Sequence, residues 1–208
     1  MKKKFNKPII FLDFDNTLLN TVSFRGELFN FIARWGIPSD TITSTYLNKK
    51  NWEDDYSIIN HLLEIEKKIK QLLPKEKIWD AVKNNYADLR RFVFPDVVPW
   101  LTQMKDDGYD LCILSYSNAD FQNFKLRAAH LDQYFTHKIY TWSRGTKGAT
   151  AFEYTKNSQI VFIDDDPFEL NNALRTLPHA KLYQMSRYGD PPKSSHALIT
   201  SLLDLQIP

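Results

Sequence analysis

The chain has 208 residues, of which 43% are hydrophobic and 14% aromatic, so it can bury one full core and a small second domain and is too apolar to be disordered. Its 27 basic and 25 acidic residues leave a net charge of +2 and are spread along the chain. This balance argues against a nucleic-acid-binding or membrane-binding surface, and we expect a soluble globular protein.

The N-terminal segment carries three lysines at positions 2–4 before an apolar run at Ile9–Leu12. Asp13 stops this run well short of the length that a signal peptide or a membrane span needs, so we interpret the lysines as a solvated tail. The single cysteine, Cys112, excludes an internal disulfide and lies in an apolar run, which is typical of a buried small side chain. Together these features predict a cytoplasmic protein.

The first predicted element is a strand at Pro8–Leu12, whose apolar residues run without alternation. Such a run is typical of a parallel strand that is covered on both faces. From about Thr21 to Phe92 the sequence shows only helical periodicity, which Gly36-Ile37-Pro38 and Pro74 interrupt. The spacing predicts helices at Phe24–Trp35, Ser39–Asn48, Trp52–Leu73 and Lys75–Arg91. We interpret this segment as an all-helical insert between the first strand and the rest of a sheet.

After Phe92, short apolar runs alternate with helical patterns. The predicted strands are Leu111–Leu114, Lys138–Thr141, Ile160–Ile163 and Ala180–Tyr183. The predicted helices are Pro95–Asp107, Ala119–Leu131, Lys147–Lys156, Pro167–Leu177 and a closing helix at Ser194–Leu205. The alternation predicts an α/β fold with a Rossmann-like open parallel sheet and helices on both faces. We expect residues 1–20 and 93–208 to form this α/β core domain and residues 21–92 to form a small all-helical domain.

Polar residues follow three of the predicted strands: Asp13 and Asp15 the first, Ser115 the second, and Asp164 and Asp165 a later one. In an open parallel sheet these strand ends meet at one edge, where ligands bind. Two unit charges about 4 Å apart repel by about 4 kcal/mol at an effective dielectric of about 20, so a cation must offset the repulsion. The candidate ligands are all oxygen atoms, with no histidine or thiolate among them, and such a set favours Mg²⁺. The histidines of the chain show no zinc-binding spacing.

These motifs carry a family resemblance. The stretch Asp13-Phe14-Asp15-Asn16-Thr17-Leu18 after a strand, then Ser115, Lys147 and the pair Asp164-Asp165, resembles the haloacid dehalogenase (HAD) superfamily of phosphohydrolases in the same order and over nearly the whole chain. The resemblance implies a HAD-like core in which the first strand lies between the strands that precede Ser115 and Asp164. It also implies that the helical insert is a first-position cap domain.

By this resemblance Asp13 is the nucleophile that forms an aspartyl-phosphate, and Asp15 is the general acid and then the general base. Asp13, the main-chain carbonyl of Asp15, and Asp165 would hold Mg²⁺, with Asp164 beside them either contacting a ligand or bound to the ion through a water molecule. Further site candidates are Ser115 and Lys147, which would bind the phosphoryl oxygens and balance their charge, and Asn118, a second candidate for substrate binding.

The dehalogenase and phosphonatase branches of this superfamily lack an acid at the second aspartate position. Asp15 therefore favours a Mg²⁺-dependent phosphatase that acts on a small phosphorylated metabolite. A phosphomutase, which passes the phosphoryl group to a sugar hydroxyl, is an alternative. A non-catalytic regulatory or binding protein is a second one, against which the mutually repelling Asp13 and Asp15 argue.

Some site assignments have competitors. Ser117 is a rival to Ser115, although an acidic residue three positions after it is typical of a capping box that opens the next helix. Arg144 or Lys138 could replace Lys147, whose spacing to the later aspartates is shorter than in many members of the superfamily. Ser115 and Lys147 are preferred.

The stretch Asp166-Pro167-Phe168-Glu169 is typical of a helix start, with Asp166 as the N-cap, Pro167 at the first helical position and Glu169 in a capping role. A cap domain would exclude water and admit small substrates, with residues 16–22 as its hinge. Specificity candidates in it are Arg25, Arg34, Tyr46 and Trp52.

Overall fold

The computed structural model describes residues 8–48, 56–155, 159–189, 196–205 and 207. The lysines at positions 2–4, Trp52 and the expected helix ends at 52–55, 156 and 194–195 lie outside the described residues. The chain divides into two compact units. One is an α/β unit of residues 1–20, 93–116 and 131–208, and the other is a helical unit of residues 21–92 and 117–130. The segment 117–130 groups with the helical unit, whereas the sequence pattern predicts it as part of the α/β core.

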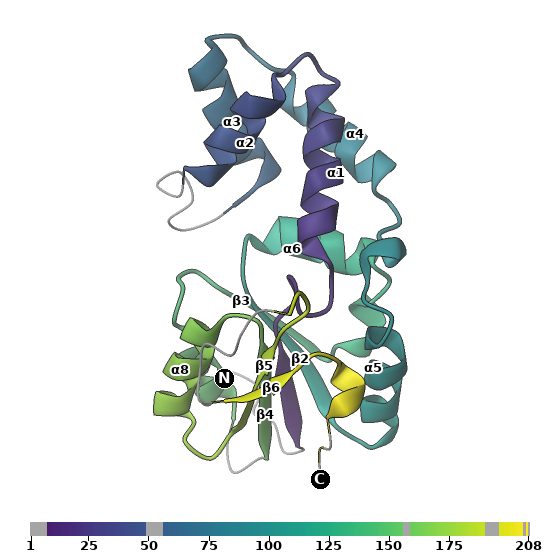
Figure 1. The fold of residues 1–208 in the computed structure, drawn as a ribbon, viewed down its shortest axis with the longest axis vertical. Helices are drawn as coiled ribbons and strands as arrows, with labels where there is room; N and C mark the ends of the chain where they lie inside the picture. Colours follow the sequence, from purple (N-terminus) through teal and green to yellow (C-terminus); the bar gives the residue numbers. More distant parts are fainter. Residues whose placement is uncertain (1–7, 49–55, 156–158, 190–195, 206, 208) are drawn as a thin grey trace. The chain divides into compact units, whose positions relative to one another are not determined.

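The α/β unit is built on a six-stranded sheet in the order β3-β2-β1-β4-β5-β6, in which every neighbouring pair is parallel (Figure 1). The strands are β1 (Ile9–Leu12), β2 (Asp110–Tyr116), β3 (His137–Thr141), β4 (Ile160–Asp164), β5 (Lys181–Met185) and β6 (Ala197–Ile199). In the central strand, Leu12 is in register with Ile113 on one side and Ile163 on the other. The predicted open parallel sheet, with the first strand at its centre, is confirmed.

Helices cover both faces of this sheet. They are α5 (Val97–Asp106), α7 (Lys147–Tyr154) and α8 (Pro167–Thr176), with short 3₁₀ turns η3 (Asp132–Tyr134) and η4 (Leu202–Asp204). Helices α7 and α8 pack against each other and against strands β2, β4 and β5, while α5 packs against β2, η3 and η4. All four residues of β1 are 0% exposed, as expected for a strand between two helical layers.

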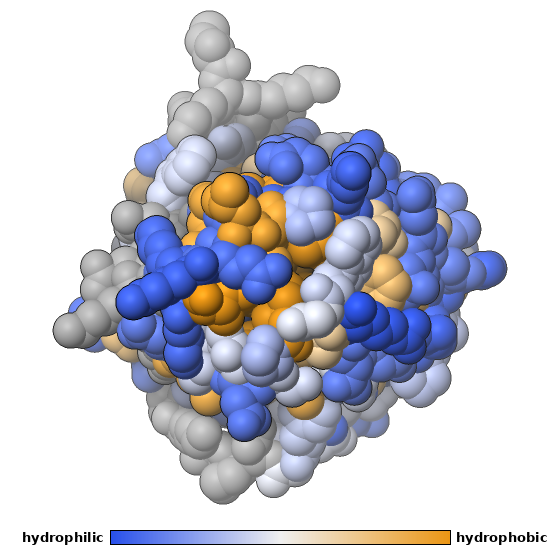
Figure 2. All heavy atoms as spheres, turned by 90° about the horizontal axis from the view of Figure 1, so that it is seen from above, coloured by the Kyte–Doolittle hydropathy of each residue, from blue (hydrophilic) through white to orange (hydrophobic). Residues whose placement is uncertain are grey.

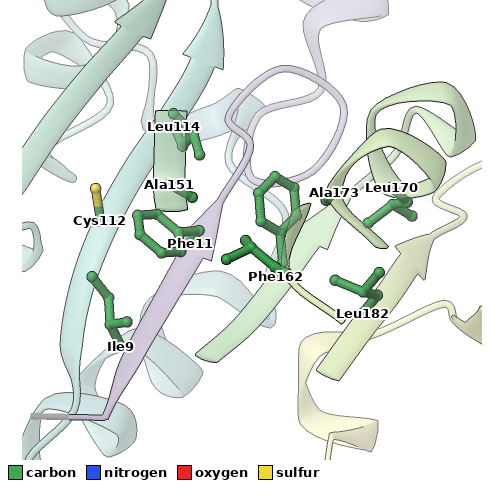
Figure 3. Packing of buried hydrophobic residues seen from close by; sticks show 10 residues of the cluster. Ile9, Phe11, Cys112, Leu114, Ala151, Phe162, Leu170, Ala173 and Leu182 are labelled. Carbon is green, nitrogen blue, oxygen red and sulfur yellow. The ribbon is translucent and has the colours of Figure 1, made fainter. Parts of the chain in front are cut away.

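The core under α7 and α8 holds the sheet against these two helices (Figure 3). Phe11 of β1 and Phe162 of β4 lie with their ring centroids 6.1 Å apart, and Cys112 is buried beside them as predicted. Burial of an apolar side chain of this size contributes about 1.5–3 kcal/mol. Because these residues lie within four positions of Asp13, Ser115 and Asp164, the core fixes the strand ends that carry the polar side chains.

The predicted closing helix at Ser194–Leu205 is wrong. Its described part forms strand β6 and then the 3₁₀ turn η4, because β5 offers an unpaired edge that β6 completes. The amide of Ser186 donates to the carbonyl of Ile199 at 2.8 Å, and the Ser201 hydroxyl caps η4 by accepting from the Leu203 amide. The leucines at 198, 202 and 205 mimic helical spacing, but Leu198 lies in β6, Leu202 in η4, and Leu205 in extended backbone after η4.

The helical unit consists of α1 (Thr21–Ala33), α2 (Ser39–Leu47), α3 (Ile58–Ile69), α4 (Lys75–Asn85), η2 (Arg90–Phe92) and α6 (Ala119–Ala128), and its described residues contain no strand. Helices α3, α4 and α6 are shorter than predicted, and α6 ends at Ala128 rather than at Leu131. Helix α3 begins after Ser57, whose side chain accepts from the Asn60 amide, and α4 ends at Asn85 rather than at Arg91. Local caps, which periodicity does not reveal, set these bounds.

A buried polar cluster lies inside the helical unit. His61 Nε2 lies 3.0 Å from the Thr45 hydroxyl, and His61 Nδ1 lies 3.1 Å from the Tyr56 hydroxyl. Burial lowers the pKa of His61 to about 4. Arg25 donates to the Tyr46 hydroxyl at 2.8 Å and lies over its ring. Two of the predicted specificity candidates, Arg25 and Tyr46, therefore contact each other.

The helical unit also keeps apolar side chains at its surface. Leu72 is 87% exposed, and Trp35 and Leu63 are exposed as well. Figure 2 shows apolar atoms gathered within a frame of hydrophilic residues. The apolar residues of this unit are therefore not all used in its own core.

Candidate active site

The loop after β1 presents two aspartates from a tightly closed turn. The Asp13 amide continues the strand by donating to the Ile163 carbonyl at 2.9 Å. The amides of Leu18 and Leu19 both donate to the Phe14 carbonyl at 3.0 Å. Asn16, at the tip, has a φ of +57°, a conformation that asparagine adopts more readily than most residues. This turn holds Asp13 and Asp15 at one end of the sheet.

An open cavity of about 380 Å³ lies at this edge of the sheet. Every residue that the sequence predicts at the strand ends lines this cavity. Its lining consists of Asp13, Asp15, Asn16, Ser115, Tyr116, Arg144, Lys147, Asp164, Asp165, Asp166, Pro167 and Glu169. The expected convergence of carboxylates is thus present in the structure.

Lys147 lies between two of the carboxylates. Its Nζ is 2.6 Å from Asp13 Oδ1 and 2.7 Å from Asp164 Oδ2, and the three side chains are at most 7% exposed. Although burial favours the neutral amine, Asp13 and Asp164 raise the pKa of Lys147 well above its usual range. The lysine is therefore a permanent positive charge inside the site.

Three aspartates crowd around this charge. Asp13, Asp164 and Asp165 each offer a carboxylate oxygen, and these atoms lie within 4.8 Å of one another. Burial, with repulsion from Asp13, raises the pKa of Asp164 to about 7 and that of Asp165 to about 9. Burial also raises the pKa of Asp13, with repulsion from Asp15 adding to it and Lys147 opposing it. One lysine cannot balance three carboxylates, and the all-oxygen donor set fits a hard divalent cation such as Mg²⁺.

Ser115, at the end of β2, is 1% exposed and its hydroxyl donates to Asp13 Oδ1 at 3.3 Å. Its rival Ser117 donates to Gln122 instead. The predicted capping box at Ser117 is wrong, because the side chain of Asn118 caps α6 by accepting from the Phe121 amide at 3.0 Å. Asn118 belongs to the helical unit, and its part in substrate binding stays a prediction.

The other basic candidates have partners elsewhere. Arg144 lies at the rim of the cavity, where it makes two hydrogen bonds to Asp166 at 2.8 and 3.0 Å. Lys138 pairs with Asp132. The structure thus brings Lys147, and neither Arg144 nor Lys138, to the buried carboxylates.

Helix α8 supports the start of α7, whose first residue is Lys147. Asp166 is its N-cap, as predicted, and accepts from the Phe168 amide at 3.0 Å. Glu169 was expected to cap the same helix but is only 2% exposed and accepts from the amides of Gly145 and Lys147, at 2.5 and 3.4 Å. No local pattern indicates this contact, because Glu169 lies 22 or more positions from the residues whose amides it accepts from.

The comparisons with known proteins agree with this geometry. Residues 8–192 match the family model of the haloacid dehalogenase-like hydrolases. The chain belongs to this family. It is therefore a hydrolase, and the resemblance noted in its motifs is confirmed. No curated protein matches the chain.

Solved structures show the same fold over nearly the whole chain of this hydrolase. A haloacid dehalogenase-like hydrolase from Burkholderia xenovorans has a TM-score of 0.78 at 18% identity, covering 95% of this chain and 94% of the other. A HAD phosphatase from Thermococcus onnurineus has a TM-score of 0.64 at 19% identity, covering 94% of each chain. An L-2-haloacid dehalogenase from Xanthobacter autotrophicus, with chloropropionic acid covalently bound, has a TM-score of 0.61 at 13% identity, covering 96% of each chain. The neighbours thus include both phosphatases and dehalogenases.

No helix among the described residues of the hydrolase is long and apolar enough to span a membrane.

Gly148 of the hydrolase sets how closely α7 approaches α8. A Cβ at this position would lie 2.4 Å from Ala173 Cα and 2.6 Å from Thr176 Oγ1, so Gly148→Ala must push the two helices apart. We expect a loss of about 1–3 kcal/mol in the free energy of unfolding, as for other overpacked sites. Because Lys147 is the adjacent residue, turnover should fall as well. Urea unfolding measures the first effect and steady-state kinetics the second.

The matched control is Gly26→Ala in α1, where a Cβ meets no atom within 4 Å. Alanine is favoured over glycine in a helix, so this variant should be as stable as the parent or more so. Equal stability of Gly148→Ala and the parent would contradict the close approach.

Proposed function

We propose that this hydrolase is a Mg²⁺-dependent phosphatase that hydrolyses a small phosphorylated metabolite through an aspartyl-phosphate on Asp13. The observation that supports it most is the pairing of two aspartates from one turn in one cavity, Asp13 and Asp15, with Lys147 beside the first. A phosphate ester needs both a nucleophile and an acid, because its leaving alkoxide must be protonated. A halide leaves as an anion and needs no such acid.

In the first step a carboxylate oxygen of Asp13 attacks the phosphorus atom, and the bond from phosphorus to the ester oxygen breaks. The carboxylic acid of Asp15 gives its proton to the departing oxygen. Ser115 and Lys147 lie at the attacking carboxylate, within 3.3 and 2.6 Å of Asp13 Oδ1, where they can donate to phosphoryl oxygens. The products are the free alcohol and an aspartyl-phosphate.

In the second step the Asp15 carboxylate takes a proton from water, whose oxygen attacks the phosphorus atom. The bond from phosphorus to Asp13 breaks, which releases inorganic phosphate and restores both side chains. Asp13, Asp165 and the main-chain carbonyl of Asp15 would hold Mg²⁺, with Asp164 beside them. When bound, the cation offsets the charge of the carboxylates and of the phosphoryl group.

The test is product analysis with purified protein, using p-nitrophenyl phosphate and a panel of sugar phosphates and nucleotides, each with MgCl₂ or with EDTA. A parallel reaction uses 2-chloropropionate with halide detection. We expect Mg²⁺-dependent phosphate release and no halide. Halide release in EDTA without phosphate release would identify a dehalogenase, and isomerised sugar phosphate without net phosphate release would identify a phosphomutase.

A further inference from the structure

A buried arginine ties the turn after β1 to the rest of the α/β unit. Arg187 follows β5 by two positions, and its side chain is only 5% exposed. Its Nε and Nη2 donate to the carbonyl of Thr17 at 3.0 and 2.8 Å. Its Nη1 donates to the two carboxylate oxygens of Asp96 at 2.9 and 2.8 Å, and the guanidinium lies over the ring of Phe94 at 4.3 Å. One guanidinium thus joins a main-chain carbonyl to a buried carboxylate.

The Thr17 carbonyl belongs to the turn that carries the two aspartates. Backbone amides satisfy other carbonyls of this turn, since Phe94 donates to Leu18 and Asn16 donates to Leu19. Thr17 is 0% exposed. Its main-chain carbonyl accepts two hydrogen bonds, both from the Arg187 guanidinium. A buried carbonyl that loses its donors is costly, so the turn depends on this guanidinium.

The other end of the contact is anchored in rigid structure. Asp96 immediately precedes α5 and is 7% exposed. It also accepts from the Leu202 amide at 2.6 Å and from the Ser201 hydroxyl at 3.2 Å. Burial disfavours its charged form, but the bonds from Arg187 and Leu202 prevail and hold the pKa of Asp96 below its usual range. Arg187 is therefore held in one place by a carboxylate fixed to α5 and η4.

The same segment contacts the turn at a second place. The Tyr188 hydroxyl lies 2.8 Å from the Asn20 side-chain oxygen and 3.4 Å from that of Asn16. Arg187 and Tyr188 also line a small cavity of about 50 Å³ together with Asn16 and Asp165. The contact thus lies beside the carboxylate cluster and spans the turn from Asn16 to Asn20.

We propose that Arg187, oriented by Asp96, is a positioning residue that holds the turn after β1 and thereby aims the carboxyl group of Asp15. This role rests on the proposed function, in which Asp15 moves protons to and from a phosphate ester. The fork of the guanidinium suits the role, because the edge with Nε and Nη2 donates to the carbonyl while Nη1 donates to the carboxylate. A lysine ammonium carries its three N–H donors on one nitrogen, so it cannot span both groups in the same way.

The test compares Arg187→Lys with the parent hydrolase. We expect kcat for p-nitrophenyl phosphate to fall by about tenfold to a hundredfold with KM little changed, as is typical when a reacting group is slightly misplaced. In hydrogen exchange, the amides of Asn16, Leu18 and Leu19 should exchange at least about tenfold faster, while those of β2 keep their rates. In Arg187→Ala, millimolar guanidinium should restore part of kcat.

The control is Arg175→Lys, an exposed arginine in the last turn of α8, which should behave as the parent does. If Arg187→Lys has the parental kcat and the parental exchange rates of the turn amides, the positioning role is wrong. The role is also wrong if the variant only has a lower unfolding midpoint and keeps the parental kcat under conditions where it is folded. If the parent releases no phosphate from any ester, the proposed function fails by itself. Hydrogen exchange of the turn then still decides whether Arg187 holds it.

Discussion

Asp13→Asn should abolish phosphate release. The amide cannot attack phosphorus to form an aspartyl-phosphate, so kcat should fall by about 10⁴-fold or more, as in other enzymes that lose the nucleophile. The variant should remain folded, since Asp13 is one of three crowded carboxylates and its removal relieves repulsion on Asp164 and Asp165. Steady-state phosphate release measures the loss. Mass spectrometry of acid-quenched parent protein should find phosphate on the peptide that carries Asp13 and none in the variant.

The control for Asp13→Asn is Asp132→Asn, the same chemical change in the same unit at a side chain that is 42% exposed and pairs with Lys138. It should keep parental activity, because the surface pair contributes little and lies outside the lining of the cavity. Activity of Asp13→Asn within tenfold of the parent would rule out Asp13 as the nucleophile.

Much of the site was predictable because a parallel sheet brings the carboxyl ends of its strands to one edge. The continuous apolar runs before Asp13, Ser115 and Asp164 place these residues without any knowledge of side-chain contacts, and the structure gathers them around one cavity. Lys147 was harder to choose, since Arg144 and Lys138 are nearby in sequence. Only the packing of α7 on α8, which Gly148 permits, brings its Nζ to the carboxylates.

The supporting contacts were not predictable, because they join residues far apart in sequence. Glu169 holds the start of α7 from 22 or more positions away, and Arg187 reaches Thr17 across 170 positions. The C-terminal error has a related cause. The periodicity of Ser194–Leu205 is typical of a helix, but residues 197–199 pair with the edge of β5 as a parallel strand. The hydrophobic pattern of a segment therefore predicts which of its residues are buried, but not which other segment covers them.

Lys147→Met should be both inactive and markedly less stable. The lysine is 4% exposed and pairs with Asp13 and Asp164, so its removal leaves two buried carboxylates without their counter-charge. Breaking a buried pair from one side typically costs about 3–5 kcal/mol. Asp164→Asn added to Lys147→Met should recover part of this loss, because it removes one uncompensated charge. Urea unfolding of the parent, the single variants and the double variant at neutral pH measures this coupling.

Mg²⁺ should stabilise Lys147→Met more than it stabilises the parent, because the cation then meets Asp13, Asp164 and Asp165 without a competing ammonium. Titration of the unfolding midpoint with MgCl₂ measures this difference. Lys138→Met is the matched control, since the described contacts of the Lys138 side chain are with the partly exposed Asp132. This variant should lose less than about 1 kcal/mol in the free energy of unfolding, and its response to Mg²⁺ should equal that of the parent. A response to Mg²⁺ in Lys147→Met no larger than in the parent would mean that the ammonium and the cation do not share these carboxylates.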